Sequence, residues 1–173
     1  MGKFKLLVMV VLVLVLALLP VAASAQPVAQ VAVVGADDVK AQVGQEFTVP
    51  VWINGVSNLY GADVRLAYDP AALAGVRVNH GNFLRQPWWV IRQGFWTWPG
   101  DGCGQCAWYA LTQLRPALPQ SGSGVLVYVT FRALRPGVTN LGVSAQLSAA
   151  GGVPIPVNVD HGVVKIIDAG SEQ

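Results

Sequence analysis

Hydrophobic and polar positions alternate strictly in two neighbouring segments of the chain. In residues 46–54 one face carries Phe47, Val49, Val51 and Ile53, and the other carries Thr48, Pro50, Trp52 and Asn54. In residues 60–68 one face carries Ala62, Val64, Leu66 and Tyr68, and the other carries Gly61, Asp63, Arg65 and Ala67. A period of two predicts half-buried β-strands with one face on a core and one on the surface. Asp69-Pro70 ends the second strand, because proline has no N–H to donate to a ladder.

Strand-like segments continue along the rest of the chain, and helical periodicity is nearly absent after Ala25. The strands are predicted at Val31–Val34, Glu46–Ile53, Tyr60–Tyr68, Gly75–Asn79, within Trp88–Trp98, and at Ala107–Thr112, Gly124–Ala133, Asn140–Ser148 and His161–Ile167. Glycine and proline separate these segments. About nine short strands with turn residues between them predict an all-β sandwich.

The first 25 residues have the features of a secretory signal peptide. Lys3 and Lys5 precede an unbroken apolar run of 14 residues, and Ala23-Ser24-Ala25 fits the small-residue cleavage rule. The run is short for a membrane span of about 20 residues. We therefore expect residues 1–25 to be cleaved after Ala25, residues 26–168 to form one domain, and residues 169–173 to be a disordered tail. The expected location is extracellular.

Charge and composition exclude several classes of function. Without the two lysines of the signal, nine basic residues face nine acidic ones, and no basic patch favours nucleic acid. No second apolar run could span a membrane. Glu46 and Glu172 are the only glutamates, so a pair of catalytic carboxylates is poorly supported. Serine nucleophile, zinc and phosphate-loop motifs are absent. We do not expect an enzyme.

The two cysteines, Cys103 and Cys106, have the spacing C-x-x-C. In an exported chain this spacing favours a small structural disulfide that closes the Gly100–Gly102 loop. A redox pair, half of a metal site and free thiols are the alternatives. A bond that closes so short a loop should stabilise the fold only modestly.

Several sequence patterns, taken in order, resemble those of the cohesin domain family. They are Gly44-x-x-Phe47-x-Val49-Pro50-Val51, the strand ending Tyr68-Asp69-Pro70, Gly81-Asn82-Phe83, Gly124-Val125-Leu126 and His161-Gly162-Val163-Val164. The resemblance covers about Val31 to Ile167. It implies a nine-stranded jelly-roll β-sandwich that binds a dockerin, a small calcium-dependent helical protein, on the outer face of one sheet. No cofactor of the module itself is implied, and calcium is expected mainly through the dockerin partner.

The same resemblance places the strand that ends in Tyr-Asp-Pro on the partner-binding sheet. The outward carboxylate that binds dockerin in family members falls on Asp63, with Arg65 beside it, while Gly61 occupies the neighbouring family Asn position. This departure sets the chain apart from familiar dockerin specificities. An ordinary solvated pair of charges is the alternative interpretation of Asp63 and Arg65.

Tryptophan is concentrated between residues 85 and 109. Alternation puts Trp96 and Trp98 on one face, and it puts Trp108 on the face opposite Tyr109. Exposed tryptophan clusters usually mark an interface, so Trp96, Trp98 and Trp108 join Asp63 and Arg65 as the predicted partner-binding residues. The alternative is that the rings pack on one another and cap the sandwich.

Carbohydrate binding is the alternative function, through the surface tryptophans Trp52, Trp88 and Trp89. Trp52 should point outward from its strand, although a single ring is thin evidence for a sugar platform. A structural subunit that self-associates through its aromatic sheet is the third hypothesis. We predict no metal site, because Asp37-Asp38 supplies too few ligands for calcium and fits turn chemistry better. His80 and His161 are expected to be loop residues.

Overall fold

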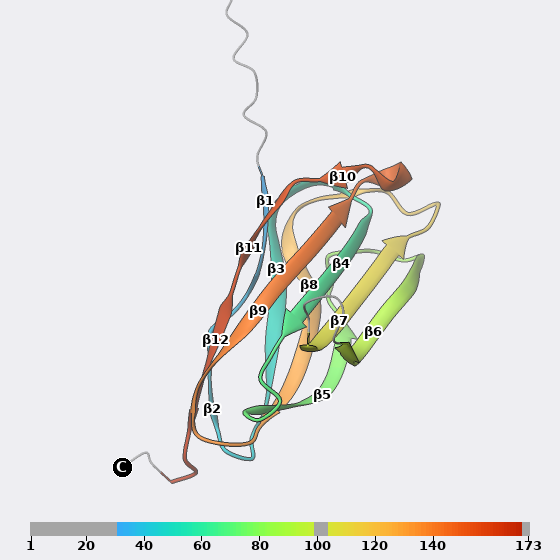
Figure 1. Ribbon diagram of the computed structural model, residues 1–173. Helices are drawn as coiled ribbons and strands as arrows, with labels where there is room; N and C mark the ends of the chain where they lie inside the picture. Colours follow the sequence, from blue (N-terminus) through green and yellow to red (C-terminus); the bar gives the residue numbers. More distant parts are fainter. Residues whose placement is uncertain (1–30, 99–103, 171–173) are drawn as a thin grey trace, which may run out of the picture.

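The computed structural model describes residues 31–98 and 104–170, which form two β-sheets packed face to face (Figure 1). The five-stranded sheet has the order β11 (Val157–Asp160), β1 (Ala32–Ala36), β3 (Glu46–Leu59), β8 (Gln120–Ala133) and β5 (Leu73–His80). The seven-stranded sheet has the order β2 (Val39–Gln42), β12 (Gly162–Ile167), β9 (Gly137–Ser148), β4 (Gly61–Ala67), β7 (Gly104–Gln113) and β6 (Trp88–Trp98), and β10 (Pro154–Ile155) pairs with β9. A short 3-10 helix, η1 (Ala150–Gly152), precedes β10.

The alternation in β3 and β4 sets which side chains enter the core between the sheets. The predicted apolar face of each strand is buried, and the opposite face is half-buried or exposed apart from Gly61. Aromatic rings from both sheets meet in this core. Phe131 is fully buried and lies against Phe47, Tyr68 and Phe95, with ring centroids 4.9–6.1 Å apart. The predicted β-sandwich is confirmed.

The terminal strands differ from the nine that alternation predicts. The first predicted strand, Val31–Val34, corresponds to β1 in the five-stranded sheet. After Asp37-Asp38 the chain forms β2, which the sequence does not predict and which joins the seven-stranded sheet. The C-terminal strand divides in the same way, because β11 pairs in parallel with β1 and β12 in parallel with β2. Alternation missed β10 and β11 because Pro154 and Pro156 interrupt this segment with turn-like residues.

Asp37 and Asp38 stabilise the crossing point between the sheets. Asp38 Oδ1 accepts a hydrogen bond of 2.8 Å from the backbone N–H of Val163, and Asp37 Oδ1 accepts one of 3.0 Å from Trp52 Nε1. The sequence predicts local turn chemistry for the two aspartates, whereas both of these bonds reach residues on other strands.

Several predictions concern residues outside the described part of the chain. The signal peptide at residues 1–25, Cys103 and residues 171–173 of the tail all lie there. The signal, the disulfide and the domain boundaries therefore stay predictions. Within residues 31–98 and 104–170, no helix is long and apolar enough to cross a membrane.

Candidate functional site

Strand β4, in the middle of the seven-stranded sheet, carries two of the predicted site residues, Asp63 and Arg65. Asp63 lies opposite Gln146 of β9 on one side and Ala110 of β7 on the other. The residues that alternate with Asp63 and Arg65 along β4 are buried in the core, so the period of two directs these two side chains to the outer face. The sheet therefore presents both charges on a paired, regular part of the backbone rather than on a loop.

Five side chains form one connected group on this face, which we call the Trp108 cluster: Asp63, Arg65, Arg92, Trp96 and Trp108. The indole N–H of Trp108 donates a hydrogen bond of 2.8 Å to Asp63 Oδ1, and Arg65 Nε lies 3.6 Å from the same oxygen. The guanidinium carbons of Arg65 and Arg92 lie 4.2 and 5.4 Å from the centroid of the Trp108 ring. The edge of one Trp meets the face of the other, with centroids of Trp96 and Trp108 5.9 Å apart.

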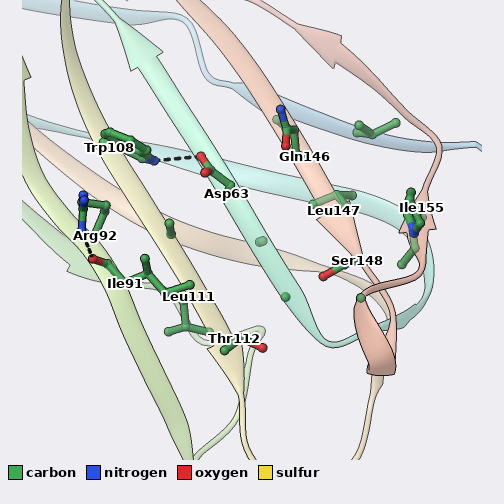
Figure 2. Close-up of a pocket in the computed structure, with 17 residues that line it drawn as sticks. Asp63, Ile91, Arg92, Trp108, Leu111, Thr112, Gln146, Leu147, Ser148 and Ile155 are labelled. Atoms are coloured by element: carbon green, nitrogen blue, oxygen red, sulfur yellow. Dashed lines mark hydrogen bonds between the residues drawn. The ribbon is translucent and has the colours of Figure 1, made fainter. Parts of the chain in front are cut away.

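A groove of about 560 Å³ opens beside the cluster on the same face. Its floor includes outward residues of β4, β7 and β9, with Ile91, Arg92 and Trp108 at one side and Ile155 at the other (Figure 2). Most of the lining side chains are apolar or small. The groove is thus an apolar trough with charged groups gathered at one side.

Gly61 lies on the floor of the groove. A Cβ added at this position would lie 2.8 Å from Ser148 Oγ, closer than real Cβ atoms come to another heavy atom. The Ser148 hydroxyl can rotate away, so a small side chain at this position would require only a local adjustment. The sequence shows Gly61 as a missing side chain, and the structure shows Ser148 Oγ beside the space that a Cβ would occupy.

The structure brings together four of the five predicted partner-binding residues. Asp63, Arg65, Trp96 and Trp108 share the outer face of the seven-stranded sheet, and the backbone of Trp98 lies in β6 while its side chain is outside the described part. The sequence left two interpretations of the tryptophans, an exposed interface or rings that pack on one another, and each describes part of the geometry. Trp96 and Trp108 contact each other and are half-buried, so each still presents part of its ring to solvent. Their role in binding stays a prediction.

The three tryptophans of the carbohydrate alternative do not share a surface. Trp52 lies in β3 of the five-stranded sheet, whereas Trp88 and Trp89 lie in β6 of the seven-stranded one. The Trp52 indole lies directly over Gly35, where an added Cβ would come within 2.3 Å of the ring. Trp88 packs against the core, and Trp89 is 67% exposed.

Trp88 forms an aromatic group with His80, which is half-buried like Trp88 itself, and with the buried Tyr109. The rings of His80 and Trp88 have centroids 4.9 Å apart, and His80 Nδ1 lies 3.2 Å from the Tyr109 hydroxyl. Burial lowers the pKa of His80, because it disfavours the charged imidazolium. Burial also raises the pKa of the Tyr109 phenol well above its ordinary value.

The site contains residues that the sequence does not single out. Arg92 and Ile91 line the groove from β6, and Ile155 lines it from β10. A register shift between Val90 and Arg92 places one extra residue in β6. Alternation alone does not predict such a bulge, and Pro154 concealed β10. The signal that remains is an isolated arginine within an aromatic strand.

Cys106 lies in β7 and is buried. Its predicted partner Cys103 lies outside the described residues. Within the part of the chain that the structure describes, no three His, Cys, Asp or Glu side chains gather as a metal site.

Comparison with known proteins shows which domains this chain resembles. Residues 32–88 match the family model of the cohesin domain. This segment ends at the start of β6 and includes Asp63 and Arg65. No curated protein matches the sequence.

Solved cohesin structures share the fold over most of the chain. A non-cellulosomal cohesin from the archaeon Archaeoglobus fulgidus is 19% identical with a TM-score of 0.64, covering 83% of this chain and 95% of the other. The seventh ScaB type I cohesin from Pseudobacteroides cellulosolvens is 20% identical with a TM-score of 0.62, covering 83% and 96%. The OlpC cohesin from Clostridium thermocellum, solved in complex with a dockerin, is 15% identical with a TM-score of 0.64, covering 80% and 95%.

The chain is thus a jelly-roll β-sandwich. The match of residues 32–88 to the family model and the shared fold both make the chain similar to cohesin domains, the family that its sequence resembles. Cohesin domains are non-catalytic binding modules, which agrees with the expectation that this chain is not an enzyme.

Proposed function

We propose that this protein is a non-catalytic receptor that binds a dockerin-like protein on the outer face of its seven-stranded sheet. The observation that carries the proposal is the apolar groove beside the Trp108 cluster, on the strand whose sequence matches the family model. Cohesins of the same fold have been solved with dockerins, among them the OlpC and OlpA cohesins of Clostridium thermocellum.

The physical properties of this face suit protein recognition. Its strands are paired on both sides through β9, β4 and β7, so the backbone of the floor is held before a partner arrives. Contacts among Asp63, Arg65 and Trp108 restrict their side chains in the same way. Prior ordering of this kind lowers the entropy lost on binding. Arg65 contacts the half-buried Trp108. Tryptophan and arginine are both residue types that are enriched at binding hot spots.

We further propose that the module works outside the cell in polysaccharide degradation. The predicted signal peptide with cleavage after Ala25 and the predicted Cys103–Cys106 disulfide support export. Calcium would enter through the dockerin-like partner, because dockerins are calcium-dependent in the family that the chain resembles.

The test is direct binding to dockerin-type modules encoded by the same host, measured with calcium and with EDTA. Gln146 is exposed on the groove floor, so Gln146→Trp should fill the groove without burying new polar groups. Asn79→Trp is the matched control, because Asn79 is exposed on β5 of the opposite sheet. We expect calcium-dependent binding that Gln146→Trp abolishes and Asn79→Trp leaves intact. Binding that survives Gln146→Trp would show that the partner uses another surface.

Carbohydrate binding is the second candidate, and the exposure of Trp89 favours it. Trp89 is 67% exposed, so its ring can stack on a sugar. Retention on insoluble polysaccharide that is lost in Trp89→Ala but kept in Trp52→Ala would support this function at β6. If the unaltered protein is not retained on the polysaccharide, carbohydrate binding is ruled out as the function.

A further inference from the structure

The charges of the two sheets are distributed unequally. The strands of the seven-stranded sheet contain four basic residues and one acidic residue: Lys40, Arg65, Arg92, Lys165 and Asp63. The strands of the five-stranded sheet contain two of each sign: Arg77, Arg132, Glu46 and Asp160. The chain after the predicted signal has no net charge, so the residues between and after the strands carry the balancing negative charge, while among the strands the excess of positive charge lies in the seven-stranded sheet.

The basic residues of the seven-stranded sheet point to its outer surface. Lys40 and Lys165 are register partners in β2 and β12, and both are exposed, while the neighbouring Ala41 and Ile166 are buried. Arg65 in β4 and Arg92 in β6 belong to the Trp108 cluster. Arg65 lies two strand spacings from β12 and three from β2, and Arg92 lies four and five, at about 4.8 Å each. Even the shortest of these separations exceeds one Debye length at physiological salt, so the lysines lie outside the contacts of the cluster.

Asp63, the carboxylate on this face, is already engaged within the protein. Its Oδ1 accepts the Trp108 indole N–H and lies near Arg65. A basic partner that approached Oδ1 would have to compete with both groups. This engagement of Oδ1 suits Asp63 to holding Trp108 in place, and its direct contact with the partner stays a prediction.

Arg92 is placed differently. It is exposed at the side of the groove, and its Nη1 donates a hydrogen bond of 2.9 Å to the carbonyl of Ile91, its own neighbour in sequence. Among the described residues, no carboxylate lies within ion-pair distance of Arg92. On the five-stranded sheet, by contrast, Arg132 pairs with Glu46 at 2.6 Å.

We propose that the partner presents carboxylates to this face, and that Arg92 binds one of them while aliphatic side chains enter the groove. This inference rests on the proposed function and specifies the partner: a dockerin-like module whose contact surface is an aliphatic ridge flanked by acidic residues. Asp63 serves as a positioning residue that holds Trp108 in place. Complementary charge of this kind mainly increases the association rate and fixes the orientation of the partner.

The test uses the protein as its host produces it and the host dockerin-type module that binds it in calcium. Association rates are measured between 50 and 400 mM NaCl for the unaltered protein and three variants. Arg92→Gln removes the charge, Arg92→Glu reverses it, and Arg77→Glu reverses an exposed charge on the opposite sheet. We expect the added salt to slow association of the unaltered protein at least about fivefold.

The variants separate the contact from a general charge effect. Arg92→Glu should slow association about tenfold and Arg92→Gln about threefold, with Arg77→Glu within about twofold of the unaltered protein. An association rate that is unaffected by salt, or Arg92→Glu and Arg77→Glu with equal effects, would overturn the inference while leaving dockerin binding intact.

If no dockerin-type module binds, the proposed function fails and a second probe still tests the polarity of the face. Two synthetic amphipathic helices with identical leucine ridges are used, one flanked by glutamates and the other by lysines. In amide NMR spectra, we expect the glutamate helix alone to shift residues of β4, β6 and β7. Equal shifts with both helices, a preference for the lysine helix, or no shift with either would overturn the inference.

Discussion

The hydrogen bond between Trp108 and Asp63 predicts a measurable loss of stability in Trp108→Phe. Phenylalanine keeps an aromatic ring in the cluster but removes the N–H that donates to Asp63 Oδ1 at 2.8 Å. A hydrogen bond to a charged group contributes about 1.5–3 kcal/mol when buried. The Asp63 side chain is 33% exposed and can bind water instead, so we expect about 1 kcal/mol from this bond.

The contact with Arg65 adds a second contribution. Its guanidinium carbon lies 4.2 Å from the Trp108 ring centroid, and cation–π contacts at exposed sites contribute about 0.5–1 kcal/mol. Phenylalanine retains part of this attraction. The expected total is therefore about 1–2 kcal/mol, which corresponds to a fall in Tm of about 2–8 °C for a domain of this size.

The assay is reversible denaturant unfolding, with calorimetry for Tm. Trp96→Phe is the matched control, since Trp96 contacts Trp108 by its ring and no indole hydrogen bond is found for it among the described residues. We expect the control to cost less than about 0.5 kcal/mol, within the range of ordinary surface changes. A double-mutant cycle of Trp108→Phe with Asp63→Ala, which removes the acceptor, should give a coupling of about 1 kcal/mol. Equal losses in the two tryptophan variants, or an additive cycle, would refute the reasoning.

Three other properties of the structure give predictions that stability measurements can check. Gly35→Ala should lower the free energy of unfolding by about 1–3 kcal/mol, because the added Cβ would lie 2.3 Å from the Trp52 ring and the ring would have to move. An unchanged Tm and unchanged indole fluorescence would contradict this packing of Trp52 on Gly35. Burial lowers the pKa of His80 in the folded state, so the unfolded chain binds more protons below about pH 6.5 and stability should fall as pH decreases from 7 to 5. His80→Gln should reduce this fall, and an identical pH profile of Tm would show that another group causes it. Reduction of the predicted Cys103–Cys106 disulfide should lower the free energy of unfolding only modestly, because the closed loop is short, and a loss above about 3 kcal/mol would argue for a larger structural role.

The inward and outward residues of β3 and β4 could be predicted from the sequence because each strand is half-buried. Alternation then encodes the face directly, and it placed Val64 inside and Asp63 outside. The same reasoning placed Trp108 on the outer face of β7, opposite the buried Tyr109.

Alternation fails where the backbone leaves a regular ladder. The bulge in β6 between Val90 and Arg92 sets which side chains of that strand reach the groove. The groove also needs Ile155 from β10, which is distant in sequence from β4 and β7. Contacts between such distant segments depend on the pairing of strands, and no local pattern specifies that pairing.

The division of the terminal strands between the two sheets has a mechanical consequence. Strands β1 and β11 run in parallel in one sheet, and β2 and β12 run in parallel in the other. Tension applied between the start of β1 and the end of β12 would act along these strands (Figure 1). Their interstrand hydrogen bonds would then be strained together in shear, instead of opening one after another. Resistance to forced unfolding depends on the height of the unfolding barrier. This arrangement of the terminal strands should therefore make the module resistant to unfolding under tension.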